Sequence, residues 1–188
     1  MEDKESIEWY QSPQALQNLL RRHVQPGMKV LIVGCGNSEL GATLYDSGVL
    51  DIINIDFSDV VIEQQREKNK DRDGMSWETM SVLEMDDGIC PPEFFDVVID
   101  KACFDCVVSN PGSARNGDLF LSGVSKRLKP QGLFIHVTFA LPQRRVKLLE
   151  VPGYKWDVTY DKNGMEKPSI DNNMDKERHY VYVMKKQF

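Results

Sequence analysis

Short apolar runs alternate along this chain with segments whose apolar residues recur at helical spacing. A run that is apolar at every position is typical of a strand buried on both faces of a parallel sheet. The pattern predicts strands at residues 29–33, 52–55, 75–80, 95–100 and 133–138. Two further β-rich segments, at residues 154–160 and 179–184, follow near the end of the chain.

Helices are predicted between these strands. Ser12 and Pro13 provide an N-cap and a first helical residue for a helix over 13–24, and Ser58 caps a helix that runs to about residue 69. Further helices are expected at residues 39–46, at 117–128 and from Pro142 onward. A Lys-Pro-Gln-Gly turn at residues 129–132 is expected to separate the 117–128 helix from the next strand.

This alternation indicates an α/β fold, because strands that alternate with helices require right-handed crossovers and a parallel sheet. We expect a Rossmann-like, seven-stranded, mostly parallel sheet with helices on both faces. No helix separates the last two β-rich segments, so the last strand is expected to run antiparallel. Residues 1–188 are expected to form a single domain, with an N-terminal helical segment at 1–27 and the sheet core at 28–188. The polar stretch at about 161–178 is long for a hairpin and is predicted to be a mobile loop.

Composition and charge narrow the possible classes of partner. No apolar run approaches the roughly 18 residues that cross a bilayer, and the acidic N-terminus is unlike a presequence. We therefore expect a cytoplasmic protein without membrane contact. The formal net charge of −6 disfavours direct binding to nucleic acid and favours a basic protein as partner.

The cysteine pattern provides little support for a metal site. Cys103 and Cys106 have a spacing found in zinc sites, but the chain has no second cysteine pair, and its histidines lie far apart. We expect reduced thiols and no bound metal.

The first predicted strand ends in a glycine turn made of Gly34, Cys35, Gly36, Asn37 and Ser38. In an open α/β sheet the ligand binds beyond the carboxyl ends of the strands, and glycines let it approach the backbone. A dinucleotide site has a third glycine where this chain has Glu39, whose carboxylate would repel a pyrophosphate. S-adenosylmethionine has no phosphate and carries a sulfonium cation, so we favour a methyl donor over a dinucleotide.

The ends of the other strands extend this candidate site. Asp56 ends the second strand, where a carboxylate can accept hydrogen bonds from both ribose hydroxyls, and Phe57 is placed to pack on the adenine. Ser81 and Val82 end the third strand, near the expected adenine edge. Asp100 and Lys101 end the fourth strand and would border the methionine part of the donor.

Several motifs are more specific than this general pattern. They are VGCGNSEL at 33–40, NIDFS at 54–58, MSWETM at 75–80, FDVVIDK at 95–101, EWY at 8–10 and HYVYV at 179–183. Together they resemble one subgroup of class I S-adenosylmethionine-dependent methyltransferases, which includes methyltransferase-like protein 13 and the lysine methyltransferases of translation elongation factor 1-alpha. The family commonly has an aspartate at the position of Ser81. The resemblance implies donor contacts from Trp9, Gly34, Asp56, Phe57, Ser81, Val82 and Lys101.

The function predicted from this resemblance is S-adenosylmethionine-dependent protein-lysine N-methylation, with an elongation factor as the suspected substrate. A lysine must lose its proton before it attacks, which favours a nearby carboxylate or tyrosine. Asp105 is the candidate orienting carboxylate, with a role in capping or at the surface as the alternative. Two other functions stay open, namely a small-molecule methyltransferase and a non-catalytic interaction protein that retains the fold.

Overall fold

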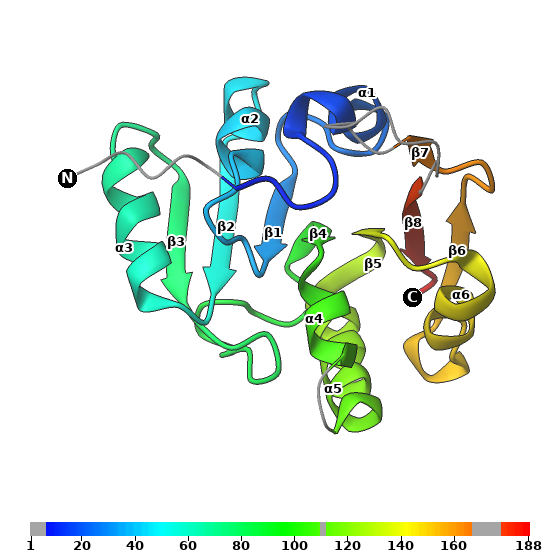
Figure 1. The fold of residues 1–188 in the computed structure, drawn as a ribbon. Helices are drawn as coiled ribbons and strands as arrows, with labels where there is room; N and C mark the ends of the chain where they lie inside the picture. The colour runs from blue at the N-terminus through cyan, green and yellow to red at the C-terminus, as the bar shows by residue number, and fades with distance from the viewer. Residues whose placement is uncertain (1–6, 110–111, 167–177) are drawn as a thin grey trace.

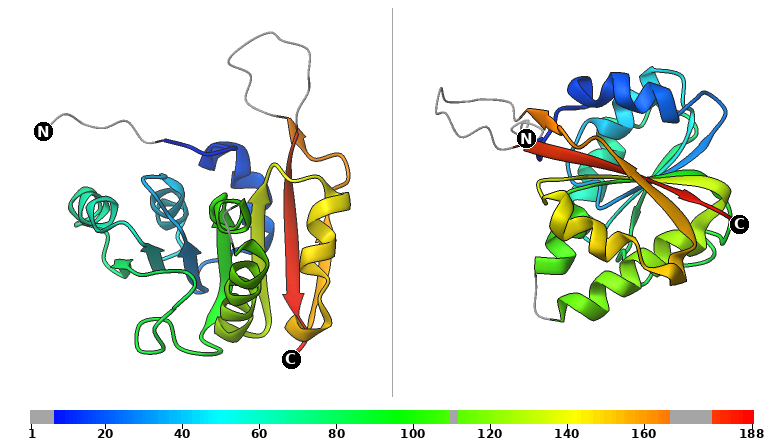
Figure 2. Two further views of the ribbon diagram at one scale, coloured as in Figure 1. Left: turned by 60° about the horizontal axis from the view of Figure 1, so that its bottom comes forward. Right: turned by 90° about the vertical axis from the view of Figure 1, so that its right-hand side faces the viewer.

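The computed structural model describes residues 7–109, 112–166 and 178–188, which form one twisted sheet covered by helices on both faces (Figures 1 and 2). The sheet has the order β3-β2-β1-β4-β5-β8-β6. Its strands are β1 (Lys29–Val33), β2 (Asp51–Asp56), β3 (Met75–Thr79), β4 (Phe95–Lys101), β5 (Leu128–Thr138), β6 (Trp156–Tyr160) and β8 (Arg178–Lys186).

The direction of the strands agrees with the prediction. Strands β1 to β5 pair in parallel, and β8 lies antiparallel between β5 and β6. The short β7 (Met165–Glu166) pairs with the start of β8 as an eighth strand outside the main path. The predicted mobile loop of 161–178 therefore contains a short strand, and its residues 167–177 lie outside the described part of the chain.

The helices divide between the two faces because successive strand residues point to opposite sides of a sheet. Val30 and Ile32 of β1 pack in one apolar cluster with α1 (Pro13–His23), α2 (Leu40–Asp46) and α3 (Asp59–Lys68). Leu31 and Val33 pack in the other cluster with α4 (Cys103–Ser109), α5 (Ser113–Arg127) and α6 (Pro142–Leu149). The right-hand view of Figure 2 shows the sheet between these two helical layers.

The predicted helix caps are present. The Ser12 hydroxyl accepts a hydrogen bond from the Ala15 amide at 3.2 Å, and the Ser58 hydroxyl accepts one from the Val61 amide at 3.4 Å. Each bond satisfies an amide that has no partner within its helix.

The structure differs from the prediction in four elements. Helix α4 was not predicted, and α5 begins at Ser113 rather than at residue 117. The predicted turn at 129–132 belongs to β5, which begins at Leu128. Leu128 pairs with Phe95, and pairing resumes at Leu133 with Val97, so the intervening residues form an irregularity within the strand rather than a separate turn. In the predicted β-rich segment 154–160, Tyr154 ends a 3₁₀ turn (Pro152–Tyr154), and β6 begins only at Trp156.

Within the described residues, no helix combines the length and the apolar character that crossing a membrane requires.

Candidate active site

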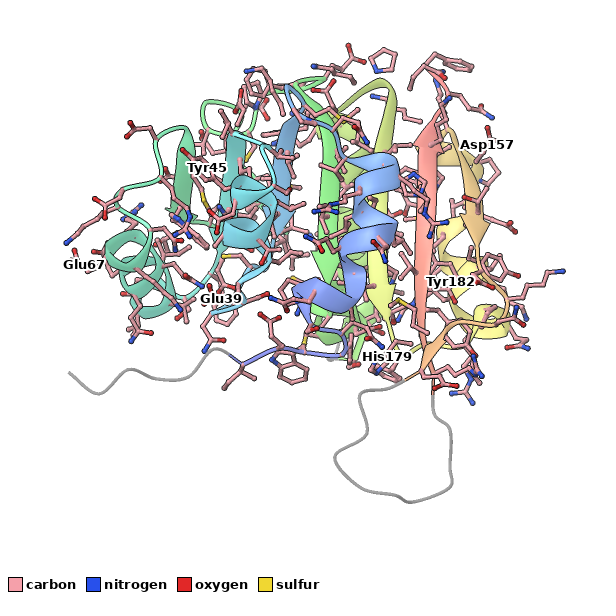
Figure 3. All side chains as sticks on the ribbon, turned by 90° about the horizontal axis from the view of Figure 1, so that it is seen from above. Glu39, Tyr45, Glu67, Asp157, His179 and Tyr182 are labelled. Atoms are coloured by element: carbon pink, nitrogen blue, oxygen red, sulfur yellow. The ribbon has the colours of Figure 1, made fainter. Side chains whose placement is uncertain are left out.

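A pocket of about 240 Å³ lies at the carboxyl ends of β1, β2 and β4, where the sequence predicts the donor site. We call it the glycine-turn pocket. Figure 3 shows Glu39 and His179 at this edge of the sheet, with Tyr45 and Asp157 toward the opposite edge. The pocket brings together most of the predicted donor contacts: Trp9, Gly34, Cys35, Gly36, Asn37, Ser38, Asp56, Phe57 and Lys101.

The two glycines of the turn have different roles. Both have positive φ, +60° at Gly34 and +52° at Gly36, which glycine adopts without strain. A Cβ on Gly34 would lie 2.4 Å from the Cys103 sulfur, so this glycine lets α4 pack against the turn. A Cβ on Gly36 would meet no atom within 4 Å, so this glycine leaves open space where a ligand can approach the backbone.

Asp56 connects the turn to the second strand through both carboxylate oxygens. Its Oδ2 accepts a hydrogen bond from the Gly36 amide at 2.9 Å, and its Oδ1 accepts one from the Ser58 amide at 3.0 Å. A carboxylate has about four acceptor positions, so each oxygen can still accept one more bond. The buried Asp56 carboxylate is therefore suited to the two neighbouring hydroxyls of a ribose.

Phe57 lies at the rim of the pocket and is 81% exposed. The volume of 240 Å³ is below the roughly 300–1,000 Å³ typical of small-molecule sites. A nucleoside ligand would therefore extend beyond the pocket, and the exposed Phe57 ring offers an apolar face for its base.

Glu8 holds the turn from the other side. Its Oε1 accepts a hydrogen bond from the Glu39 amide at 2.7 Å, and its Oε2 accepts one from the Ser38 hydroxyl at 2.8 Å. The same Oε2 lies 2.7 Å from the Lys101 ammonium, which also donates to the Trp9 carbonyl at 3.0 Å. Lys101 thus lines the pocket as predicted, but its charge is paired with Glu8, a partner that the sequence pattern does not indicate.

Three predicted donor contacts do not line the glycine-turn pocket: Ser81, Val82 and Asp100. The Ser81 hydroxyl accepts a hydrogen bond from the Leu83 amide at 3.2 Å, in a turn after β3. Asp100 is fully buried, where its carboxylate lies 2.5 Å from His136 Nδ1 and accepts the Phe104 amide at 3.2 Å. Its contacts join β4 to α4 and β5.

The structure also brings residues to the pocket that the prediction did not include. Cys103 and Cys106 line it from α4, together with Ile7 and Ala102. Burial raises the pKa of the Cys103 thiol well above its usual value. Among the described residues, no group of three or more His, Cys, Asp or Glu side chains is placed to hold a metal ion.

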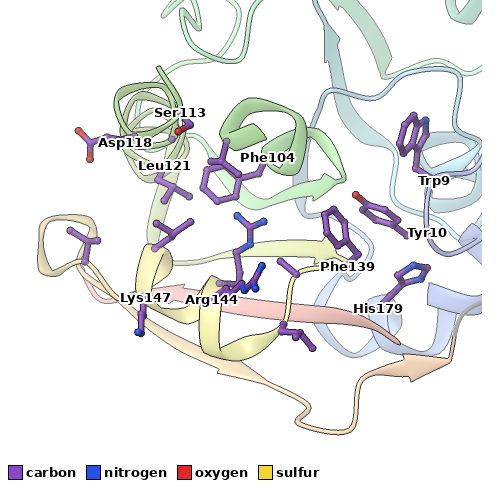
Figure 4. Close-up of a pocket in the computed structure, with 18 of the residues that line it drawn as sticks. Trp9, Tyr10, Phe104, Ser113, Asp118, Leu121, Phe139, Arg144, Lys147 and His179 are labelled. Carbon is purple, nitrogen blue, oxygen red and sulfur yellow. The ribbon is translucent and has the colours of Figure 1, made fainter. Parts of the chain in front are cut away.

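A second, larger cavity of about 1370 Å³ adjoins this pocket, and Trp9 and Phe104 are among the residues that line it. We call it the large cavity. It lies between α4 and α5 on one side and α6 on the other (Figure 4). Figure 4 shows Trp9, Tyr10, Phe139 and His179 at one end and Ser113, Asp118 and Leu121 at the other. Trp9 lines both spaces, so both extend to this residue.

Asp105, the candidate orienting carboxylate, is buried beneath the large cavity rather than exposed in it. Its Oδ1 accepts a hydrogen bond from the Thr138 hydroxyl at 2.7 Å and pairs with the buried Arg145 guanidinium. The Tyr10 hydroxyl lies beside it, and burial together with the charge of Asp105 raises the pKa of Tyr10 far above its usual value. Asp105 therefore contacts the side chains that form the cavity wall.

Comparisons with known proteins identify the family. A family model described as a methyltransferase domain matches residues 24–182. The eEF1A lysine and N-terminal methyltransferase of Bos taurus is 38% identical over 140 residues, which cover 73% of this chain and 20% of that protein. The EEF1A lysine methyltransferase 4 of Bos taurus is 30% identical over 167 residues, which cover 84% of this chain and 64% of that protein.

The fold is shared with solved structures. A SAM-dependent methyltransferase from Methanosarcina mazei has a TM-score of 0.69 at 13% identity, and the likeness covers 90% of this chain and 97% of that chain. The match to the methyltransferase domain supports S-adenosylmethionine as the cofactor. The open backbone at Gly36 and the buried Asp56 carboxylate fit that cofactor. This chain belongs to the methyltransferase domain family, as its sequence motifs predict.

Proposed function

We propose that this chain is an S-adenosylmethionine-dependent protein-lysine N-methyltransferase that acts on a basic protein of the elongation factor 1-alpha type. The observation that carries the proposal is the adjacency of two spaces. The glycine-turn pocket suits a nucleoside donor, and the large cavity beside it offers room for an acceptor side chain. The names of the relatives support lysine as the acceptor. The match covers 20% of the length of the eEF1A lysine and N-terminal methyltransferase of Bos taurus.

When bound, the donor supplies a methyl group attached to a sulfonium, which needs little covalent assistance from the protein. The residues of this chain would hold the donor and orient the acceptor, and such positioning can supply a large part of the rate increase. Gly36 would let the donor lie against the backbone, and Asp56 would accept the ribose hydroxyls. Trp9, which lines both spaces, would border both the bound donor and the acceptor.

The wall of the large cavity suits the loss of a proton from a lysine. Apolar side chains such as Phe104 and Phe139 line it together with cationic ones such as Arg144. An apolar surrounding and neighbouring positive charges both lower the pKa of an ammonium, because both disfavour its charged form. A neutral amine is the form that attacks a methyl group, so this wall would favour the reactive state. The net charge of −6 would draw a basic protein toward the chain.

The proposal is tested with purified eEF1A, tritiated S-adenosylmethionine and mass spectrometry of the product. We expect label on the protein and a mass increase of one or more methyl groups on a lysine. Asp56→Ala serves as the variant with an impaired donor site, and Asp59→Ala, an exposed aspartate three residues away, serves as the matched control. Wild-type protein that binds the donor but labels no lysine of eEF1A or of a cell lysate would contradict the proposal.

A small-molecule acceptor is the second candidate, and the size of the large cavity favours it. A volume of about 1370 Å³ exceeds the roughly 300–1,000 Å³ that hold most small ligands, so a whole metabolite would fit. Label found only in the low-molecular-weight fraction of a lysate would support this candidate over protein methylation. A non-catalytic interaction protein would bind no donor in calorimetry. The cytoplasmic location stays a prediction.

A further inference from the structure

Tyr10 has a backbone conformation that bulky residues rarely adopt. Its φ is +66°, in the left-handed region that favours glycine. Such a conformation persists only where the surrounding contacts impose it, and it is often found at functional sites. The segment that contains Tyr10 crosses the carboxyl edge of the sheet before α1, between the glycine-turn pocket and the large cavity.

Contacts on both sides of Tyr10 hold this conformation. The carbonyl of Trp9 accepts a hydrogen bond from Lys101, and the Gln11 side chain donates to the Glu166 carbonyl at 2.7 Å. The Tyr10 ring lies 4.9 Å from the His179 ring and 5.8 Å from the Phe139 ring, measured between centroids. The ring is therefore fixed at the end of the large cavity that is nearest to Trp9 (Figure 4).

The surroundings of the Tyr10 hydroxyl define what it can bind. Asp105 lies beside it, and Cys106, which lines the glycine-turn pocket, is near enough to act on it electrostatically. The bonds of Asp105 to Thr138 and Arg145 both end on Oδ1, while Oδ2 is buried and has no hydrogen-bond partner in the described part of the chain. A buried acceptor without a donor is unfavourable, so Oδ2 is an available partner for the Tyr10 proton.

The protonation state of Tyr10 sets the direction of its hydrogen bonds. Burial, reinforced by the charge of Asp105, raises the pKa of the phenol, so it stays neutral over the working pH range. A neutral hydroxyl that gives its proton to Asp105 keeps its oxygen lone pairs for an incoming N–H group. Tyr10 would then act as an oriented hydrogen-bond acceptor and not as a base.

We propose that the Tyr10 hydroxyl, oriented by Asp105, accepts a hydrogen bond from the acceptor amine and aims its nitrogen lone pair at the transferred methyl group. This inference rests on the proposed function. In the step, the nitrogen–carbon bond forms as the carbon–sulfur bond breaks, and the sulfonium becomes a neutral thioether. The methylated amine carries the positive charge and later releases its proton to water. Asp105 is then a positioning residue that acts through Tyr10.

The test uses a ligand that carries an amine where the reaction takes place. Sinefungin has a carbon-bound amine in place of the sulfonium methyl, whereas S-adenosylhomocysteine has neither the methyl nor the amine. Calorimetry on the whole chain compares both ligands with the wild type and Tyr10→Phe. We expect Tyr10→Phe to bind sinefungin roughly tenfold more weakly, with unchanged binding of S-adenosylhomocysteine, because one hydrogen bond to a charged group is lost.

Tyr45→Phe is the matched control, because Tyr45 lies on α2 toward the opposite edge of the sheet (Figure 3). It should bind both ligands like the wild type. If Tyr10→Phe weakened the binding of both ligands equally, Tyr10 would have a purely structural role. If it left sinefungin binding unchanged, the Tyr10 hydroxyl would lie out of reach of the position where the methyl group is transferred. Either result overturns the inference.

Activity measurements on the wild type and on Tyr10→Phe distinguish a failure of this inference from a failure of the proposed function. With labelled donor and eEF1A, Tyr10→Phe should lower kcat more than it raises KM, because the lost hydrogen bond aligns the reacting amine. If wild-type protein labels no lysine while the difference in sinefungin binding is present, the proposed acceptor is wrong and the role of Tyr10 stands.

Discussion

Removal of the Asp56 carboxylate is the most direct test of the donor site. The carboxylate holds the Gly36 and Ser58 amides at 2.9 and 3.0 Å, one on each oxygen. Two of its roughly four acceptor positions then stay available for the two ribose hydroxyls. Hydrogen bonds that involve a charged group contribute about 1.5–3 kcal/mol, so we expect Asp56→Ala to weaken donor binding by roughly ten- to hundredfold.

The same substitution also affects the protein without a ligand. Asp56→Ala leaves the Gly36 amide without its partner, and an unsatisfied buried donor destabilises by about 1–3 kcal/mol. Asp56→Asn has the same shape, keeps one acceptor oxygen and replaces the other oxygen with a donor. It is therefore expected to retain more of the stability than Asp56→Ala while it still loses the charged contact with the ribose.

Calorimetric titration with S-adenosylmethionine and S-adenosylhomocysteine measures the loss, and urea unfolding measures the stability. Asp59→Ala is the control, because Asp59 is exposed in the first turn of α3 and bonds only its neighbour Val60 in the described structure. A folded Asp56→Asn and a folded Asp56→Ala that both bind donor within twofold of the wild type would refute the assignment of Asp56 to the ribose.

Two further predictions concern the buried ion pair and the thiols. Arg145→Met leaves the buried Asp105 charge without its cation and should lower the free energy of unfolding, measured in urea, by about 3–5 kcal/mol. Arg144→Met, at the exposed neighbouring position, should change it by less than about 0.5 kcal/mol. Equal stability of the two variants would contradict the ion pair between Arg145 and Asp105. Burial raises the pKa of the Cys90 and Cys106 thiols, to about 11 at Cys90, but only Cys106 is exposed, so near pH 8 Cys106 should be alkylated first. Its alkylation should become faster as the pH rises, because the thiolate is the reactive form. Since Cys106 lines the glycine-turn pocket, bound donor should slow its alkylation in a mass-spectrometric time course, and an unchanged rate with saturating donor would place the donor elsewhere.

The fold could be predicted from the sequence because its elements have strong local patterns. Strand β1 is apolar at every position after Lys29, and β4 has an apolar centre from Val97 to Ile99, since both faces of these strands are covered. Ser12 and Ser58 marked helix starts that the structure contains, because a capping hydroxyl acts within three residues of its own position. Elements that are determined by neighbouring residues can therefore be recognised from the sequence.

The elements that were missed depend on contacts distant in sequence. Helix α4 has only seven residues, too few for a helical repeat of apolar positions to be recognised in the sequence. It forms where the Phe104 amide bonds the Asp100 carboxylate and where Gly34 leaves room for Cys103. The extension of β5 through Pro130 likewise depends on the pairing of Leu128 with Phe95, which the sequence of β5 alone does not contain.

The part of the candidate site that could be predicted is the part that lies directly at the ends of strands. The glycine turn and Asp56 follow from strand ends, which a parallel sheet brings together at one edge. Ser81 and Val82 also follow a strand end, but the chain turns after β3 and does not bring them to the pocket. Whether a residue just after a strand reaches the pocket depends on the conformation of the loop that follows. No residue pattern in this chain indicates that conformation.

The segment before α1 unites the two halves of the site. The sheet supplies Gly36 and Asp56, but Glu8 holds the glycine turn and Lys101. Trp9 lines both the glycine-turn pocket and the large cavity, and Tyr10 lines the large cavity. A donor whose carboxylate reached Lys101 would compete with Glu8 for the same ammonium, which the structure buries to 5% exposure of its side chain. Lys101 therefore links donor binding to the position of this segment, because the ammonium that a donor carboxylate would reach is the one that pairs with Glu8 and bonds the Trp9 carbonyl.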